Sequence, residues 1–163
     1  MRGERETAAL LVAEALPLAR ESPLARHLLH RVFGTMIGAA AGPAEARAVV
    51  ERADLLLGVD DRCVFCSIMF LVPAAIACAR VGDVEDAEGL LDAARRSAQL
   101  WEGTSWMAAI GEVEGAIADA RGDEPAAHAH LVRAAESFER AGQPLDARRC
   151  RDAAGKVQGR IGS

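Results

Sequence analysis

The sequence predicts an all-α protein made of one domain of consecutive amphipathic helices. Ala and Leu dominate the 163 residues, tyrosine is absent and aromatic residues make up only 4%. β-Branched residues never alternate with polar ones over the length of a strand. Apolar residues recur instead at the i, i+3, i+4 spacing of a helix face, as they do between residues 5 and 20. A chain of this length can bury a sizeable core, so neither a disulfide nor a metal is required for folding.

Turn and capping signals divide the chain into eight expected helices. Ser22 followed by Pro23 is a start signal, because serine caps a helix and proline suits its first position. Gly42-Pro43, Gly82-Asp83, Gly122-Asp123 and Gly142-Gln143-Pro144 predict turns, and the expected caps are Asp60 or Asp61, Asp83, and Thr104 or Ser105. The expected helices are 5–20, 23–41, 44–57, 61–81, 84–100, 106–121, 124–140 and 145–157, followed by a fraying tail from Gln158.

The most apolar stretch of the chain is 60–81. As a helix it would be apolar nearly all round, so the other helices are expected to cover it on every side. Pro73 removes one N–H and collides with the carbonyl of Met69, which predicts a kink. The run from Cys63 to Ala79 is at the short edge of a membrane span, but the proline, the alanines and the amphipathic neighbours favour a buried helix of a globular protein.

Composition and charge limit the location and the partners. The net charge of −5 with interspersed signs argues against direct nucleic-acid binding, because no basic face remains to neutralise phosphates. The first six residues carry acids and lead into a helical pattern, so no signal peptide is indicated and a cytoplasmic location is expected. The four cysteines are then expected to stay reduced.

Part of the chain repeats. Ala79-Arg80-Val81-Gly82-Asp83 returns as Ala120-Arg121-Gly122-Asp123, with the two Gly-Asp pairs 40 residues apart. The same apolar positions follow each glycine: Ala87, Leu91 and Ala94 after the first, and Ala127, Leu131 and Ala134 after the second. A looser copy begins at Gly42 with Ala46, Val50 and Ala53, and a partial one at Gly142 with Ala147 and Ala154.

This pattern resembles the tetratricopeptide repeat, in a degenerate version with a period nearer 40 residues than 34. The resemblance covers residues 23–154 and implies a right-handed stack of about three antiparallel helix pairs, 23–57, 61–100 and 104–141, an α-solenoid with an extra N-terminal helix (5–20) and a C-terminal capping helix (145–157).

A second resemblance rests on Cys63-x-x-Cys66, the stretch Pro73–Ala79, Gly82-Asp83, Trp101-x-Gly103-Thr104-x-Trp106, Phe138, and Ala141-Gly142-Gln143-Pro144-Leu145-Asp146-Ala147-x-x-Cys150. Together these look like the C-terminal helical-repeat region of large actinobacterial transcriptional regulators. Those proteins join an ATPase module and a helix-turn-helix domain to such repeats. No ATPase motif G-x-x-x-x-G-K-[ST] occurs in the chain, so the resemblance implies the sensor or scaffold region alone.

The sharpest candidate site combines His27-x-x-His30 with Cys63-x-x-Cys66. On a helix, residues i and i+3 share a face, so each pair can present two ligand atoms in one direction. In a repeat stack the helices that carry the two pairs lie side by side. His27 and Cys63 are 36 residues apart, close to the repeat of about 40, so the two pairs lie within roughly one helical turn of each other along the helix axes. Two thiolates and two imidazoles predict a closed, structural zinc site, and zinc is the one cofactor considered.

Two other interpretations of these residues stay open. Free cysteine is among the most buried residue types, so Cys63 and Cys66 are also explained as small core residues with the histidines at a groove edge. A cysteine near a helix N-terminus can have a lowered pKa, as in Cys-x-x-Cys oxidoreductases, but the βαβ context of those enzymes is missing.

The remaining candidates are less specific. Trp101 and Trp106 flank a Gly-Thr loop and either line a groove or pocket or pack at the edge of the core. Gly111 and Gly115 lie inside one expected helix, which predicts close approach of another backbone. His128 and His130 are expected to be solvated, as are the scattered carboxylates Glu85, Asp86, Glu88, Glu112, Glu114 and Asp119.

The sequence as a whole predicts a non-enzymatic protein-interaction or regulatory module, part of or related to a bacterial transcriptional regulator. Its concave face, built from the first helices of the pairs, would bind a protein or peptide. No catalytic residues are expected, and neither is contact with nucleic acid or membrane. The alternative is a zinc-containing regulatory domain that senses metal or thiol state. A third, a small-ligand site near the tryptophans, has least support. The oligomeric state is left open, with a homodimer among the alternatives.

Overall fold

The all-α prediction is confirmed. The computed structural model describes residues 2–58 and 63–161, and these residues form eight α-helices and one short 3-10 helix, with no strand among them. The elements are α1 (Arg2–Glu21), α2 (Ala25–Ala39), α3 (Pro43–Leu57), α4 (Ile68–Arg80), α5 (Val84–Ala98), η1 (Gln99–Trp101), α6 (Trp106–Ala120), α7 (Glu124–Arg140) and α8 (Pro144–Ile161).

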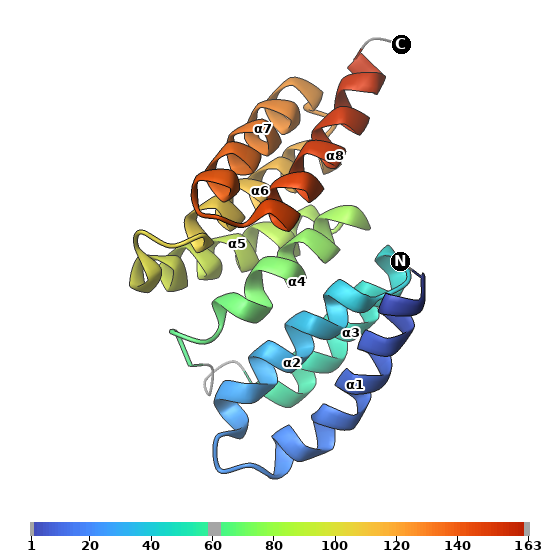
Figure 1. Cartoon of the computed structure of the whole chain (residues 1–163), viewed down its shortest axis with the longest axis vertical. Coiled ribbons are helices and arrows are strands. Elements are labelled where there is room, and N and C mark those ends of the chain that lie inside the picture. The colour runs from blue at the N-terminus through green and yellow to red at the C-terminus, as the bar shows by residue number, and fades with distance from the viewer. Residues whose placement is uncertain (1, 59–62, 162–163) are drawn as a thin grey trace.

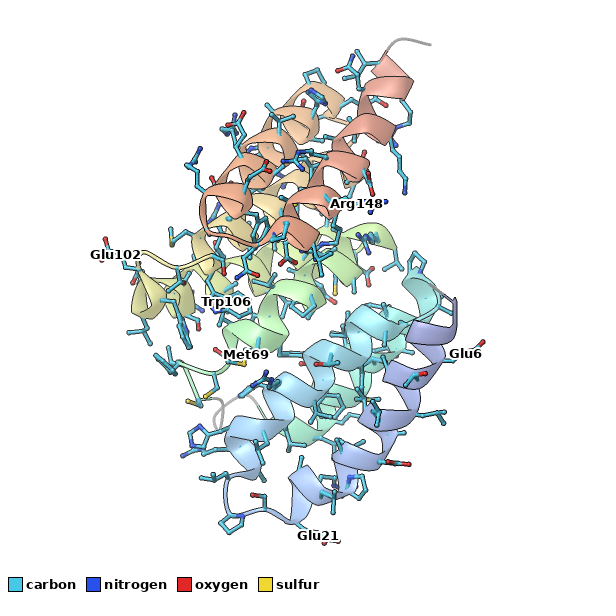
Figure 2. All side chains as sticks on the ribbon, viewed as in Figure 1. Glu6, Glu21, Met69, Glu102, Trp106 and Arg148 are labelled. Atoms are coloured by element: carbon cyan, nitrogen blue, oxygen red, sulfur yellow. The ribbon has the colours of Figure 1, made fainter. Side chains whose placement is uncertain are left out.

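Each α-helix packs against the next one along the chain, and α2 also contacts α4, as α4 contacts α6. Figure 1 shows α1, α2 and α3 together at one end and α6, α7 and α8 at the other, with α4 and α5 between them. One buried apolar cluster runs from Ala19 on α1 to Cys150 on α8, and a smaller one joins α7 to α8. Met69 and Trp106 lie at the margin of the main cluster, half-buried against it (Figure 2).

The helix α4 is covered on all sides, as its composition predicts. Its buried residues are Ile68, Phe70, Leu71, Val72, Ala74, Ala75, Ile76, Ala77, Cys78 and Ala79. The helix runs without a break through Pro73. It begins at Ile68, however, and not near residue 61, because residues 64–67 form turns. The expected cap at Asp60 or Asp61 lies outside the described residues.

The repeated turns have one backbone geometry. Gly82 and Gly122 have φ of +87° and +75°, a left-handed conformation that glycine adopts without a Cβ penalty. After each glycine the aspartate N–H donates to a carbonyl five residues back, from Asp83 to Cys78 and from Asp123 to Ala118, which closes a Schellman motif. The apolar positions that repeat after these glycines are all buried: Ala87, Leu91, Ala94, Ala127, Leu131 and Ala134.

Some caps and helix ends differ from the prediction. Asp83 makes no side-chain cap, because its carboxylate accepts from Arg47 Nε at 2.8 Å. The N-cap residue of α6 is Ser105, whose side chain makes no cap hydrogen bond, whereas Thr104 Oγ1 accepts from the Trp106 N–H at 3.3 Å. The last helix continues to Ile161, past the expected end near 157. No helix within the described residues combines the length and apolarity that crossing a bilayer requires.

The two glycines of α6 differ in their surroundings. A Cβ built on Gly115 would lie 2.7 Å from Leu131 Cγ and 3.4 Å from the carbonyl oxygen of Ala127, so α7 approaches α6 closely there. A Cβ on Gly111 would lie 3.5 Å from the Ala134 Cβ, which is an ordinary contact. The predicted close approach is therefore found at Gly115.

Candidate functional site

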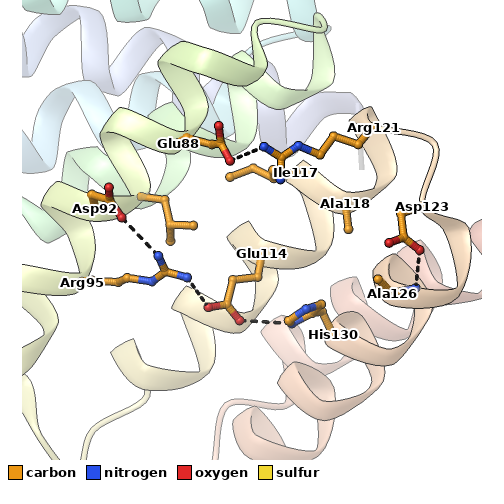
Figure 3. A pocket seen from close by; sticks show the side chains of 11 residues that line it. Glu88, Asp92, Arg95, Glu114, Ile117, Ala118, Arg121, Asp123, Ala126 and His130 are labelled. Carbon is orange, nitrogen blue, oxygen red and sulfur yellow. Dashed lines mark hydrogen bonds and ion pairs between the residues drawn. The ribbon is translucent and has the colours of Figure 1, made fainter.

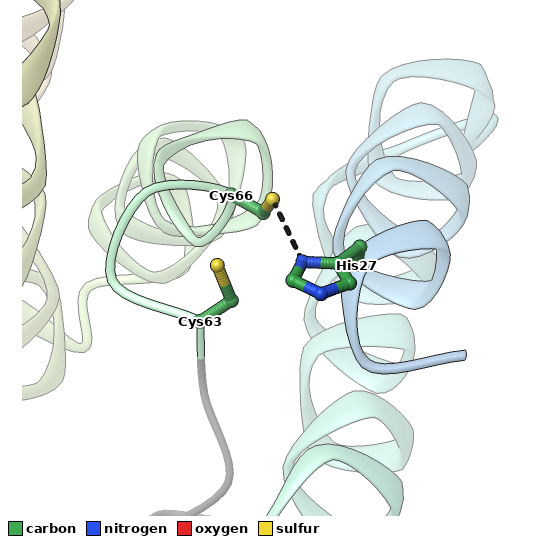
Figure 4. A group of neighbouring side chains, drawn as sticks. All are labelled: His27, Cys63 and Cys66. Atoms are coloured by element: carbon green, nitrogen blue, oxygen red, sulfur yellow. Dashed lines mark hydrogen bonds between the residues drawn. The ribbon is translucent and has the colours of Figure 1, made fainter. Parts of the chain in front are cut away.

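Three of the four predicted ligands lie together. His27 on α2 and Cys63 and Cys66 on the turn before α4 place one ligand atom each within 4.8 Å of the others. The Nδ1 atom of His27 is 3.3 Å from the Cys66 Sγ, and Figure 4 shows both sulfurs on the side of the turn that faces His27. His27 is exposed, whereas both cysteines are half-buried. Water and ions can therefore reach the group from one side.

The cysteine pair is shaped by a turn and not by the predicted helix. The N–H groups of Cys66 and Ser67 donate to the Cys63 carbonyl at 3.0 and 2.8 Å. The Ser67 hydroxyl donates to the Val64 carbonyl at 3.0 Å. These bonds fold the segment back on itself, so residues i and i+3 still point in one direction, although the helical argument for it does not apply.

His30 is not part of this group, which corrects the predicted set of two histidines and two cysteines. Its side chain is fully buried, and its ring centroid lies 6.4 Å from that of Phe70 on α4. One helical turn separates His27 from His30 on α2, and that turn moves the second ring from the exposed end of the helix into the core. The four-ligand site is thereby reduced to one imidazole and two thiols.

The three remaining atoms suit a soft metal ion. Zn–S bonds of about 2.3 Å and Zn–N bonds of about 2.0–2.1 Å in a tetrahedron place neighbouring N and S ligands about 3.5 Å apart. The His27 to Cys66 separation of 3.3 Å is close to that value before any metal is considered. Three protein ligands leave one tetrahedral position for water or another ligand, which is the arrangement of open zinc sites and not of closed structural ones.

The two thiols differ in acidity. Burial acts to raise the pKa of the Cys63 thiol, but the net pKa is lowered by hydrogen bonds from the backbone and side chain of Cys66 and the backbone of Phe65, together with the charge of Arg26. Burial and the neighbouring Cys63 both raise the pKa of Cys66. Because metals bind thiolates, the more acidic Cys63 is the sulfur that a metal ion would engage with less competition from protons.

Trp101 lies on the opposite side of the same turn. Its Nε1 donates to the Phe65 carbonyl at 2.8 Å, and the two aromatic rings stack with centroids 4.1 Å apart. Trp101 and Trp106 both pack half-buried against the main core. This arrangement agrees with their interpretation as core-edge residues, and neither lines the charged groove described next.

A groove of about 510 Å³ lies between α5, α6 and α7. Figure 3 shows its polar contacts: the ion pairs of Arg121 with Glu88 and of Arg95 with Asp92 at 3.1 Å and Glu114 at 2.8 Å, and the contact of His130 Nδ1 with Glu114 at 3.1 Å. The groove thus lies between α5 and α7, whereas the sequence analysis predicted a binding face built from the first helices of the expected pairs.

Several groups expected to be solvated are not. His128 Nδ1 lies 3.2 Å from the Ala154 carbonyl oxygen, and His130 is paired with Glu114. Glu112 is only 4% exposed, and Arg149 on α8 binds both of its carboxylate oxygens, at 2.7 and 2.5 Å. The partners are 37 residues apart in sequence, and no local spacing signals the pair.

Comparison of the chain with protein-family models, with curated proteins and with solved structures finds no match. The resemblances to tetratricopeptide repeats and to actinobacterial regulators therefore stay predictions from the quoted residues. What is shown is the class: an all-α chain of eight helices, each packed on its neighbours, within the part of the chain that the structure describes.

Proposed function

We propose that this protein is a zinc-containing regulatory domain in which His27, Cys63 and Cys66 hold the metal. The observation that carries the proposal is the convergence of these three ligand atoms within 4.8 Å from two segments 36 residues apart in sequence. Zinc would join α2 directly to the start of α4, two helices that already pack together. The open fourth position would allow exchange of water for a further ligand, which suits a responsive site.

The proposal predicts tight binding of one zinc ion and a matching gain in stability. Zinc that binds only the folded chain raises the free energy of unfolding by about 2.7 kcal/mol at a free concentration 100 times its Kd. For a chain of this size each kcal/mol raises Tm by about 2–4 °C. The measurements are elemental analysis of protein purified without added metal, and thermal unfolding with zinc and with a chelator.

Variants separate the site from other metal binding. His27→Ala and Cys66→Ser should each abolish the zinc-dependent rise in Tm. His130→Ala is the matched control, because this histidine belongs to the charged groove and not to the group of three. A reduced protein that retains less than about a tenth of an equivalent of zinc, with a Tm indifferent to chelator, would reject the proposal.

A second candidate is a protein-interaction module, and the groove between α5 and α7 favours it. We propose for it a tetratricopeptide-like, right-handed stack of helix pairs, as in the repeat region of a transcriptional regulator. The contacts of α2 with α4 and of α4 with α6 support side-by-side first helices.

The groove is lined by four acids, Glu88, Asp92, Glu114 and Asp123, and by two arginines, Arg95 and Arg121. These acids outnumber the arginines by two, and this excess of negative charge favours a basic peptide.

The interaction candidate predicts salt-dependent binding of a peptide rich in arginine and lysine. Glu114→Gln should weaken that binding by about two- to fivefold, the effect of roughly 0.5–1 kcal/mol for an exposed ion pair. Glu102→Gln is the control, since this residue lies on a separate loop (Figure 2) and does not line the groove. Fluorescence polarisation measures both variants, and equal affinity for an acidic peptide of the same length would contradict a charge-selected groove.

A further inference from the structure

The turn that carries the two cysteines is held from both sides. Its sulfurs face His27, while its two intervening residues bind the segment that leads from α5 into η1. The Ser97 hydroxyl donates to the Val64 carbonyl at 2.5 Å, and Trp101 donates to the Phe65 carbonyl at 2.8 Å. The Phe65 and Trp101 rings stack on each other. A change in the conformation of this turn therefore reaches α2 on one side and the Trp101 segment on the other.

We propose that residues 63–67 form a redox-sensitive switch with two mutually exclusive states. In the reduced state Cys63 and Cys66 share zinc with His27. In the oxidised state the two sulfurs form a disulfide, zinc leaves, and the Phe65–Trp101 pair rearranges. This inference rests on the proposed zinc site and adds to it the regulation of that site.

The geometry brings the sulfurs near enough for either state. Both lie within 4.8 Å of each other on one side of a four-residue turn. A disulfide requires an S–S distance of about 2.05 Å and a Cβ–Cβ distance of about 3.5–4.5 Å, so the turn has to tighten. Once the sulfurs are bonded to each other neither is a thiolate, and His27 is left as the only ligand of the three. A lone imidazole does not retain zinc in competition with water, and the two states therefore exclude each other.

A low-molecular-weight disulfide, RSSR, is the oxidant class that balances this reaction. One cysteine thiolate attacks a sulfur of RSSR, forms a mixed disulfide and releases RS⁻. The second cysteine sulfur attacks the first, closes the Cys63–Cys66 bond and releases another RS⁻. The two cysteine sulfurs are oxidised, RSSR is reduced to two thiols, and the zinc ion passes to water or to another ligand.

Trp101 is coupled to this reaction because it binds a carbonyl inside the ring that the disulfide closes. The Val64 and Phe65 carbonyls belong to the peptide units between the two cysteines, so tightening the turn shifts the acceptors of Ser97 and Trp101. Phe65 is 46% exposed and Val64 58% exposed. The switch therefore alters an apolar patch at the surface as well as the buried side of the turn.

The test uses the full chain with Trp106→Phe, which leaves Trp101 as the sole tryptophan emitter, because the sequence contains two. The zinc-loaded protein is titrated with oxidised glutathione in the presence of a zinc indicator. We expect about one zinc released per disulfide formed, with thiols counted in denaturant falling from four to two. The Trp101 emission should change with the same midpoint, and a reductant with added zinc should restore it.

Two variants in the same background separate the steps. Phe65→Leu removes the stacked ring but keeps the backbone carbonyl that accepts from Trp101, so it should leave zinc release intact while it reduces the emission response. Cys66→Ser should abolish both. Retention of zinc after the disulfide has formed, or zinc loss without any change at Trp101, would overturn the switch while the zinc site stands. Failure of the reduced protein to take up zinc would overturn both.

Discussion

Replacing Gly34 by alanine is expected to destabilise the protein by about 3 kcal/mol, the upper range for overpacking a close-packed interface. A Cβ built on Gly34 would lie 2.0 Å from the Met69 carbonyl oxygen and 3.0 Å from its carbonyl carbon. The obstacle is backbone and not the end of a flexible side chain, so α2 and α4 have to move apart. Since each kcal/mol lowers Tm by about 2–4 °C in a chain of this size, the shift is easily measured.

Pro73 explains why α2 comes so close at this point. Proline has no N–H, so the carbonyl of Met69, four residues earlier, has no partner from Pro73 within α4. A neighbouring helix can approach the Met69 carbonyl this closely only at a residue that has no side chain. Gly34 meets this requirement, and the Pro73 ring lies 3.4 Å from the position its Cβ would take. The glycine and the proline thus form one contact between two helices.

The matched control lies one turn further along the same helix. A Cβ on Gly38 would meet nothing within 4 Å, so Gly38→Ala should stabilise the protein by about 0.5–1 kcal/mol through helix propensity alone. Urea denaturation measures both variants. Gly34→Ala should also weaken zinc binding, because separating α2 from α4 separates His27 from the cysteines. A Gly34→Ala variant as stable as Gly38→Ala would contradict the close contact.

The two Gly-Asp turns and the buried positions that follow them could be predicted from sequence because their signals are local. Gly82 and Gly122 stand where a left-handed residue ends a helix, and the alanines and leucines that follow have helical spacing. Such features depend on residues within one or two turns. The burial of Ala87, Leu91 and Ala94 follows from them without knowledge of the partner helices.

The start of α4 could not be predicted in the same way. Apolar residues continue from Cys63 into the helix without interruption, and an apolar run by itself does not separate a turn from a buried helix. The turn depends on its carbonyls, two of which accept from Ser97 and Trp101, more than 30 residues away. The histidines show the same limit. The spacing of His27 and His30 places both rings near one face of α2. Which of the two rings lies beside the cysteines and which enters the core depends on how α2 packs against α4.

Glu112 shows what local rules miss, whereas the close contact at Gly34 was within their reach. A glycine inside a helix indicates a close approach, the rule that identified Gly115, and it applies equally to Gly34. Glu112 carried no such signal. A lone carboxylate is usually solvated, and its burial depends on Arg149, which the chain supplies from another helix.

Arg149→Ala is expected to cost about 3 kcal/mol, the lower end for breaking a buried ion pair. The Arg149 guanidinium binds both oxygens of Glu112 and also Asp146 Oδ1 at 2.5 Å. These hydrogen bonds raise the pKa of Arg149, and those to Glu112 have the largest effect. Arg149 therefore stays a cation across the accessible pH range. Removing the arginine side chain leaves the Glu112 carboxylate, which is only 4% exposed, buried between α6 and α8 without a cation. We expect a cost at the lower end of the range for buried ion pairs, because the Arg149 side chain is itself 49% exposed and water can occupy part of its place in the variant.

The double variant distinguishes an ion pair from simple packing. Glu112→Gln with Arg149→Met removes both charges, and it should cost less than Arg149→Ala because no charge is left buried. Arg148→Ala is the control at the neighbouring position. That side chain is 76% exposed and lies 4.0 Å from Asp152, so its loss should change stability by less than about 0.5 kcal/mol. Urea unfolding of the four proteins gives the comparison. Equal losses for Arg148→Ala and Arg149→Ala would show that the Glu112 contact contributes nothing, whereas the expected order would show that this contact stabilises the packing of α8 on α6.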